Sequence, residues 1–338
     1  RFRNVTGVQT CALPILFALF GCGEKKNNAT DKATGGATQK KIDYKIGDEY
    51  FLKYGFTPGI KYTYKVTSTS ENVQSQGPQS QSSKIDLKYS LTIDPTSVDT
   101  TGEVDLKIKF NYMKVDAAIG DQKLSYDSKN PADTAKRRIP AFAEYVAFQN
   151  ADFATRINAS GEVLEIFRVD NILKNILAEN ADKVNDNIKN QLRTNIEDQL
   201  RSIAQQLFQY IPQNGIKINS GWNKTTIEKL GEDDAKNIAE YKLTSVENKN
   251  GKDIALITAD LRSETAKRKS VENKGAKYDF DKPVIGGKGT IEFDLESGIV
   301  VKRDLLTNVN LGMTVSQAGQ TIRVITKVKN AVLVELEK

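Results

Sequence analysis

Few side chains in this sequence are suited to catalysis or metal binding, and histidine is absent altogether. Without histidine the chain lacks the commonest general base, the commonest metal ligand and any serine–histidine or cysteine–histidine nucleophile. Acidic pairs such as Asp279 and Asp281 occur, but none has the spacing of a calcium-binding loop. We therefore expect a protein that is not an enzyme, with no catalytic residue, no metal site and no cofactor.

Cys22 stands where a covalent modification is expected. Residues 16–22 (LFALFGC) end an apolar run with a small residue, Gly21, and a cysteine, as in the signal peptide of a bacterial lipoprotein. Residues 22–48 are largely polar and rich in Lys, Gly, Ala and Thr, which is typical of a flexible tether. The sequence thus predicts lipidation at Cys22, residues 16–21 as the end of a signal peptide, and a membrane as partner through the lipid anchor.

The first residues are interpreted as foreign to the protein. Residues 7–15 (GVQTCALPI) resemble the in-frame translation of a common sequencing adapter, so residues 1–15 are taken as a sequence artefact. With Cys11 set aside, Cys22 is the one cysteine that remains. This predicts no disulfide and no thiolate metal site.

Charge and hydropathy define the rest of the chain. The net charge of +6 is small for 338 residues and is spread over mixed-sign segments, which argues against nucleic acid as a partner. No further stretch is long and apolar enough to cross a bilayer. We expect residues 49–338 to form a single β-rich domain in the cell envelope, anchored by lipid to the outer membrane.

One long segment has helical periodicity, and the segments around it read as strands. Apolar residues recur every three or four positions over residues 184–211, which predicts a buried helix face within about 169–211, ended by Pro212. Polar and apolar residues alternate over 85–93 and 104–112, as in half-buried antiparallel strands. The apolar face of a helix in a chain made mainly of strands must be buried against a sheet. We predict an α+β fold in which a large curved antiparallel sheet, an open or half barrel, packs on a central helical segment.

Three polar segments are predicted to be loops, and one aromatic residue is a candidate for ligand binding. Residues 68–83 are a low-complexity Ser/Gln tract, interpreted as a mobile hairpin tip, and residues 120–137 and 262–281 are polar or charged. Trp222, the single tryptophan, follows a turn and could stack on a sugar or a lipid. A lone tryptophan after a turn is more often an anchor in the core, so both interpretations stay open.

Several short motifs together resemble a known family. They are residues 52–56 (LKYGF), 157–164 (INASGEVL), 210–212 (YIP), 216–222 (IKINSGW) and 289–298 (GTIEFDLESG). The chain resembles uncharacterised lipoproteins of the Bacteroidota, the DUF6263 family, over most of residues 50–338, with Ser220 standing where the resemblance would place Asp. The family implies no activity. The order of elements is also similar to lipoprotein carriers of the LolA/LppX kind, whose curved sheet wraps around helices and leaves an apolar cavity for lipid.

Two functions follow from these observations. The first is a non-enzymatic envelope lipoprotein that binds a lipid or another hydrophobic small molecule between sheet and helices. The second is a structural or protein-interaction module of the envelope, with a solid core and no ligand, acting through surface loops such as residues 68–83. A copurified hydrophobic ligand would separate the two.

Overall fold

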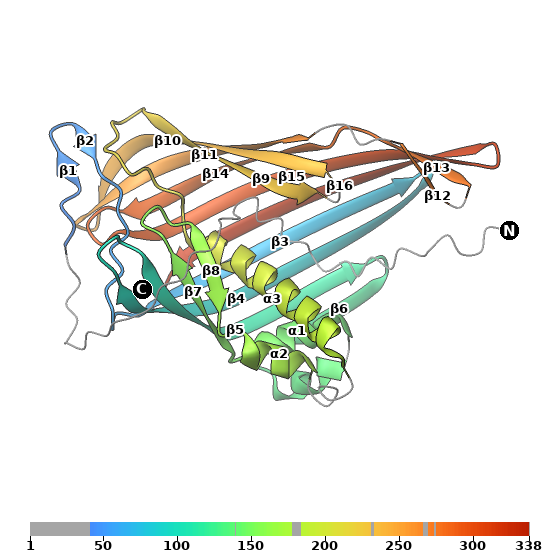
Figure 1. The fold of residues 1–338 in the computed structure, drawn as a ribbon, viewed down its shortest axis with the longest axis horizontal. Coiled ribbons are helices and arrows are strands. Elements are labelled where there is room, and N and C mark those ends of the chain that lie inside the picture. Colours follow the sequence, from blue (N-terminus) through green and yellow to red (C-terminus); the bar gives the residue numbers. More distant parts are fainter. Residues whose placement is uncertain are drawn as a thin grey trace.

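The computed structural model describes residues 41–138, 140–177, 184–230, 233–265, 270–273 and 275–337. Its main feature is one antiparallel sheet of 14 strands, whose path runs β8-β7-β5-β4-β3-β16-β15-β14-β11-β10-β9 (Figure 1). The path begins with β8 and ends with β9, so the sheet stays open and does not close into a barrel. The predicted α+β fold with a large open antiparallel sheet is confirmed.

The elements follow one another with mostly short connections. The first two strands, β1 (Lys45–Ile46) and β2 (Glu49–Tyr50), form a separate small hairpin. The strands before the helical segment are β3 (Tyr62–Gln76), β4 (Gln79–Val98), β5 (Val104–Ile119), β6 (Gln122–Asp127), β7 (Asp152–Ile157) and β8 (Val163–Phe167). Those after it are β9 (Gly221–Leu230), β10 (Asp233–Lys249), β11 (Lys252–Thr265), β12 (Val271–Asn273), β13 (Ala276–Phe280), β14 (Val284–Asp294), β15 (Ile299–Gln317) and β16 (Gln320–Leu336). The helices are the 3-10 helix η1 (Pro131–Arg138), α1 (Pro140–Phe148), α2 (Asp170–Leu177) and α3 (Asp186–Leu207).

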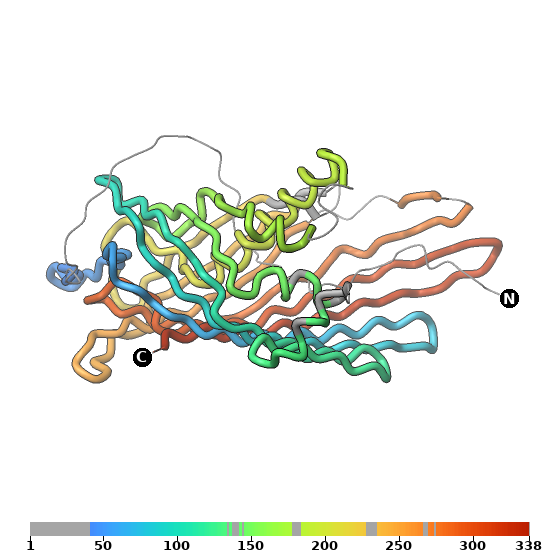
Figure 2. The backbone as a smooth tube through the Cα atoms, turned by 90° about the horizontal axis from the view of Figure 1, so that it is seen from below, coloured from blue at the N-terminus to red at the C-terminus, as the bar shows by residue number. Residues whose placement is uncertain are grey.

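The helices lie on one face of the sheet, which we call the inner face. Arg303 of β15 identifies this face, because its Nη1 donates hydrogen bonds to the carbonyl oxygens of Gln205 and Gln206 at the end of α3, both at 3.0 Å. In Figures 1 and 2 the hairpins β3–β4 and β15–β16 extend well past the helices. We call the part with the helices the closed end and the projecting hairpins the open end.

Two hydrophobic clusters fill the closed end. The larger packs the inner face of β3, β4, β5, β7 and β8 against the helices, and the smaller packs β10, β11 and β14 against the chain around Leu52 and Ile211. Tyr54 packs against both clusters. Each large apolar side chain buried here contributes roughly 1.5–3 kcal/mol, so the closed end supplies most of the hydrophobic stabilisation.

The predicted helical segment forms two helices, α2 and α3, and ends earlier than expected. Asn185 caps α3, its side chain accepting a hydrogen bond from the Ile188 amide at 3.0 Å. The helix ends at Leu207, so the prediction that it continues to Pro212 is wrong. Phe208 is already extended, with φ −115° and ψ 136°, which lets its buried ring pack edge-on against Tyr54 at 6.2 Å. Tertiary packing ends the helix before proline can.

The three segments predicted to be loops consist largely of regular secondary structure, so this prediction is wrong. Residues 68–83 continue β3 and β4 almost to their tip, where a two-residue turn begins at Gly77 with φ 56°. Residues 120–137 contain β6 and η1, and residues 262–281 contain the end of β11 together with β12 and β13. Backbone hydrogen bonds to a neighbouring strand do not require apolar side chains, so polar residues extend a ladder that apolar residues begin.

Candidate functional site

The motifs that carry the family resemblance lie far apart in sequence and meet at the closed end. The Tyr54 ring contacts the Phe293 ring edge-on, with centroids 5.7 Å apart. One residue further on, the Gly55 amide donates a hydrogen bond to the Gly298 carbonyl at 3.0 Å. A Cβ on Gly298 would lie 2.3 Å from the Lys53 carbonyl oxygen, so this approach of two backbones requires glycine.

The middle motifs join the same contact region. The Ile211 amide donates to the Ser160 carbonyl at 3.0 Å, and the Tyr54 hydroxyl donates to the Gln209 carbonyl at 2.7 Å. Gly161 has φ 83°, and a Cβ there would lie 2.5 Å from both the Gln209 carbonyl oxygen and the Tyr54 ring. The motif residues therefore build one junction between the two hydrophobic clusters.

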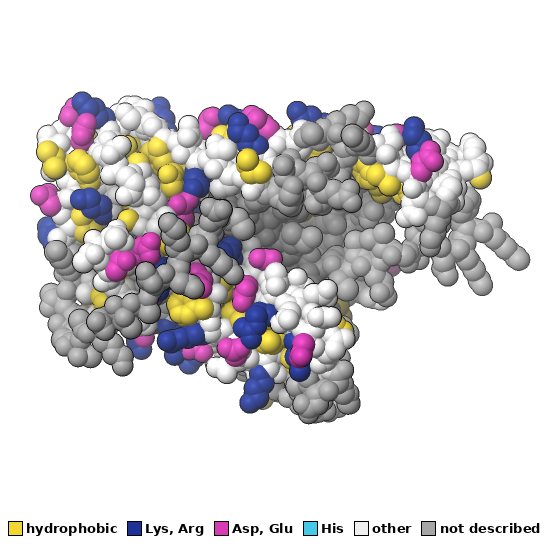
Figure 3. All heavy atoms as spheres, in the orientation of Figure 1, with side chains coloured by type: hydrophobic (Ala, Val, Ile, Leu, Met, Phe, Trp, Pro, Cys, Tyr) yellow, Lys and Arg dark blue, Asp and Glu magenta, His cyan; other side chains and the backbone are white. Residues whose placement is uncertain are grey.

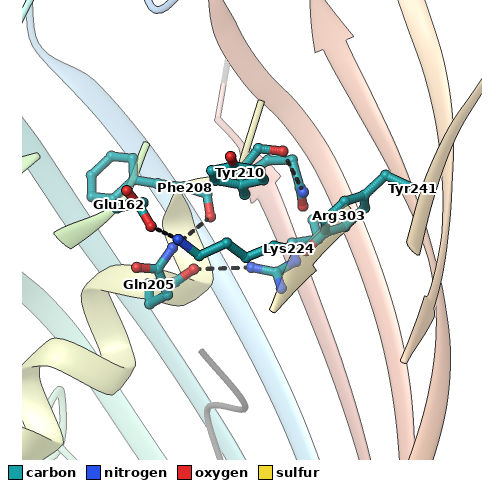
Figure 4. Close-up of a pocket in the computed structure, with 8 residues that line it drawn as sticks. Glu162, Gln205, Phe208, Tyr210, Lys224, Tyr241 and Arg303 are labelled. Carbon is teal, nitrogen blue, oxygen red and sulfur yellow. Dashed lines mark hydrogen bonds and ion pairs between the residues drawn. The ribbon is translucent and has the colours of Figure 1, made fainter. Parts of the chain in front are cut away.

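A small cavity opens at this junction, beside the end of α3 (Figure 4). The space open to the centre of a water molecule is about 20 Å³, enough for a group the size of one or two waters. Its lining combines two cations, one carboxylate, two amides and three aromatic rings: Glu162, Gln205, Phe208, Gln209, Tyr210, Lys224, Tyr241 and Arg303. A small polar group is the kind of occupant that this lining favours.

Arg303 is the most unusual of the lining residues. Its side chain is 8% exposed, and burial lowers the pKa of its guanidinium. It forms no ion pair with any residue of the described ranges, and its close ionisable neighbours Tyr54 and Tyr241 are phenols whose pKa burial raises, so they are neutral. The two carbonyl oxygens at the end of α3 offset part of the charge through the helix dipole.

Lys224 closes the gap between the two edges of the sheet. It lies on β9, one edge strand, and forms an ion pair with Glu162 from the turn between β7 and β8 at the other edge (Figure 4). Its ammonium also lies 4.8 Å from the centre of the Tyr210 ring, a cation–π contact. Burial lowers the pKa of Lys224. Side chains thus join the two edges here in place of a backbone ladder.

Trp222, the candidate ligand-binding residue, borders this region but does not line the cavity. Its indole Nε1 donates to the Tyr210 carbonyl at 3.1 Å, and its ring stacks on Tyr241 with centroids 5.5 Å apart. These contacts hold the segment before β9 onto the sheet. They match the interpretation of Trp222 as an anchor.

The other sequence-predicted sites lie mostly outside the described residues. Cys22, the signal peptide and most of the tether lie outside the described residues, although Tyr44 within the predicted tether already donates a hydrogen bond to Asp253 at 2.7 Å. In the described ranges, no group of three His, Cys, Asp or Glu residues is arranged to hold a metal ion. A search of the same ranges finds no helix with the length and apolar character needed to span a membrane.

A second feature, missed by the sequence analysis, runs along the inner face from the edge of the closed end to the open end. Residues paired across β15 and β16 share a face with Arg303, and most of them are apolar. We call this set the apolar strip: Leu305, Val309, Leu311, Met313 and Val315 of β15 with Ile322, Val324, Val328 and Val332 of β16. Thr307, Thr326 and Asn330 interrupt it. Alternation over residues 305–315 was the signal that could have found it.

The apolar strip continues onto β13 and lies beyond the main packing of the helices. Phe280 pairs with Met313 and Tyr278 with Val315, which places both aromatic rings on the same face. In Figure 3 hydrophobic side chains gather toward the right-hand end, where β13 meets β15 in Figure 1. The helices pack chiefly on β8 and on one another. Met313 and Val315 accordingly keep part of their surface exposed.

The fold and the junction define the structural class of this protein, which is an open antiparallel half barrel with helices packed against its inner face. The chain belongs to the family DUF6263, a family of unknown function, whose model matches residues 101–300. A search of curated proteins finds no match.

Three solved structures show a distant likeness. One, titled for lipid–protein interactions in lipovitellin, has 11% sequence identity and a TM-score of 0.43; the match covers 84% of this chain but 25% of that one. A COG4313 outer membrane channel from Pseudomonas putida F1 has 7% identity and a TM-score of 0.15, covering 86% and 99%. A DUF1329 family protein from Desulfovibrio piger has 11% identity and a TM-score of 0.08, covering 80% and 85%.

Proposed function

We propose that this protein is a non-enzymatic lipoprotein of the cell envelope that carries a hydrophobic small molecule on the apolar strip. The observation that supports the proposal is the position of the strip. It lies on the inner face of an open sheet, begins at Leu305 and Val332, which belong to the closed-end clusters, and continues from there to the open end. Ligand sites are mostly apolar concave surfaces with a few polar groups at one place, which is the arrangement of the strip and the Arg303 cavity.

The opposite face of the same strands provides the contrast. Lys288, Asp304 and Lys302 project there, and Lys288 is 85% exposed in an ion pair with Asp260. Charged residues are therefore frequent on the outer face, where Leu306 is an apolar exception that is 37% exposed. On the inner face Val309, Val324 and Val332 are buried, and the other residues of the apolar strip keep part of their surface exposed.

Attachment to the membrane is part of the proposal and rests on the sequence around Cys22. A diacylated cysteine followed by a tether would hold the half barrel close to a bilayer, from which a hydrophobic ligand can be collected. Expressed in a bacterial host, the protein should fractionate with membranes, and Cys22→Ser should move it to the soluble fraction. A wild-type protein that is soluble and unmodified at Cys22 would refute the anchor.

Ligand carriage is tested by native mass spectrometry of the Cys22→Ser protein purified from cells. We expect an additional mass that organic extraction removes. Leu311→Arg, on the apolar strip, should abolish this mass, whereas Leu306→Arg is a matched control because Leu306 lies on the outer face of the same strand and is 37% exposed. A protein without bound ligand that also fails to bind a hydrophobic dye would favour the solid-core interaction module.

A further inference from the structure

The proposed carrier leaves one group at the closed end without a full set of partners. An arginine side chain has five N–H donors, and Nη1 of Arg303 uses its two on the carbonyl oxygens of Gln205 and Gln206. The three donors of Nε and Nη2 have no hydrogen-bond partner within the described ranges, although the residue lines the cavity and is more than nine-tenths buried. A buried guanidinium in this state favours an anion.

The second observation is the continuity between this guanidinium and the apolar strip. Arg303 and Leu305 are successive inner-face residues of β15, and the strip continues from Leu305 to Val315. At about 3.4 Å per residue this distance is roughly 34 Å, long enough for an extended hydrocarbon chain. A charged group therefore lies at one end of a row of mostly apolar side chains, in which Leu305 packs against the smaller cluster and Val309 is buried.

We infer that the carried ligand is an amphiphile with a small acidic head, a carboxylate, which Arg303 binds while the hydrocarbon chain lies along the apolar strip. This inference rests on the proposed function and specifies its ligand class. Arg303 presents a planar pair of donors that fits the two oxygens of a carboxylate. The other cation, Lys224, is already paired with Glu162, so the net positive charge of the cavity belongs to Arg303.

The size of the cavity supports a small head. A space of about 20 Å³ for water centres admits a carboxylate more readily than the glycerol and phosphate of a phospholipid. The phenols of Tyr54 and Tyr241 near Arg303 are neutral, and Glu162, the one carboxylate of the lining, is paired with Lys224. The ligand would neutralise the guanidinium, whose burial is otherwise costly.

The test compares three probes on the delipidated full-length Cys22→Ser protein by calorimetric titration. Palmitate has both a hydrocarbon chain and a carboxylate, hexadecanol has the chain without the carboxylate, and acetate has the carboxylate without the chain. Palmitate should bind roughly tenfold to a hundredfold more tightly than hexadecanol, because the alcohol lacks the charge-assisted hydrogen bonds. Acetate should bind far more weakly than palmitate.

Two variants test the role of Arg303. Arg303→Met should lower palmitate affinity to the level of hexadecanol and leave hexadecanol affinity unchanged. Arg303→Lys retains a cation that can cap α3 but lacks the planar pair of donors, and it should retain part of the preference for palmitate. If Arg303→Met does not fold, the Lys variant and the wild-type comparison still decide the question.

Each outcome has a distinct meaning. Equal affinity of the wild type for palmitate and hexadecanol would overturn the acidic head and leave the carrier standing. Binding of neither would overturn the proposed function itself. Acetate as tight as palmitate would overturn the amphiphile, because the cavity would then be a site for a free anion alone.

Discussion

The closed and open ends of the molecule are built from the same strands and differ in what covers their inner face. On β3, Tyr62, Tyr64 and Val66 are buried in the larger hydrophobic cluster. Further along the same strand, residues 70–76 are Ser, Glu, Asn, Val, Gln, Ser and Gln, none of them buried. Both halves pair with β4 and β16 in one unbroken register.

This difference shows that the length of a strand and the length of a core are set by separate forces. The ladder continues as long as a neighbour offers backbone partners, while burial ends where helices and loops end. The open end of β15 and β16 nevertheless keeps apolar residues on one face. That mismatch is what the carrier proposal explains.

The largest expected effect is a difference in the free energy of unfolding between a substitution at the closed end and one at the open end. Phe293 is fully buried at the closed end against Tyr54, so Phe293→Ala should lower the free energy of unfolding by about 3–5 kcal/mol. Met313 on the apolar strip is partly exposed, and Met313→Ala should cost about 1 kcal/mol in the ligand-free protein. Urea unfolding measures both. Similar losses would mean that both ends share one core.

A medium effect concerns the acid stability of the closed end. Burial alone raises the pKa of Asp294, but hydrogen bonds from Lys252 and from the Ser297 side chain and amide outweigh it, and the net pKa lies below its usual value. A depressed pKa in the folded state means that Asp294 stabilises the fold above about pH 4 and that this contribution is lost as pH falls through the folded pKa.

Asp294→Asn should therefore lower the free energy of unfolding near neutral pH by about 1–3 kcal/mol, because the Lys252 ammonium loses its charged partner. Between pH 5 and 2 the variant should lose less further stability than the wild type. Urea unfolding across that range checks this. Parallel curves for the two proteins would show that Asp294 contributes nothing to acid unfolding.

The smallest expected effect is at the contact between the two sheet edges. Glu162 and Lys224 are partly exposed, so Glu162→Gln should cost at most about 1 kcal/mol, and less at high salt. Glu335→Gln is a suitable control because the Lys302–Glu335 pair is about half exposed and lies within the ladder of β15 and β16. A loss well above that of the control would indicate that the two edges hold the half barrel closed.

Much of the fold was predictable because the alternation of polar and apolar residues along a strand shows directly which of its faces is buried. Residues 85–93 and 104–112 alternate, and they form β4 and β5 as expected. The helical stripe predicted α3, in which Ile196, Leu200 and Ile203 are buried. The polar extension at residues 68–83 was missed, since no side-chain pattern marks a stretch of strand that is polar and, apart from Ser68, not buried.

The candidate site was less predictable, for the same reason. Arg303 has no local signal, because one arginine in a strand looks like any other solvated charge. Its burial depends on the end of α3, some 100 positions earlier in the chain. Trp222 was visible as a unique residue, but its place beside the cavity depends on Tyr210 and Tyr241.

The sequence by itself determined the period of each segment, the absence of histidine chemistry and the motifs of the DUF6263 family. These properties depend on composition and on neighbours within a few residues. Only the tertiary structure decided where the helix ends, which charge is buried and which part of a strand face is only partly buried. Those outcomes depend on contacts between residues far apart in the chain, such as Tyr54 with Phe293 and Arg303 with Gln205, and no local pattern encodes them.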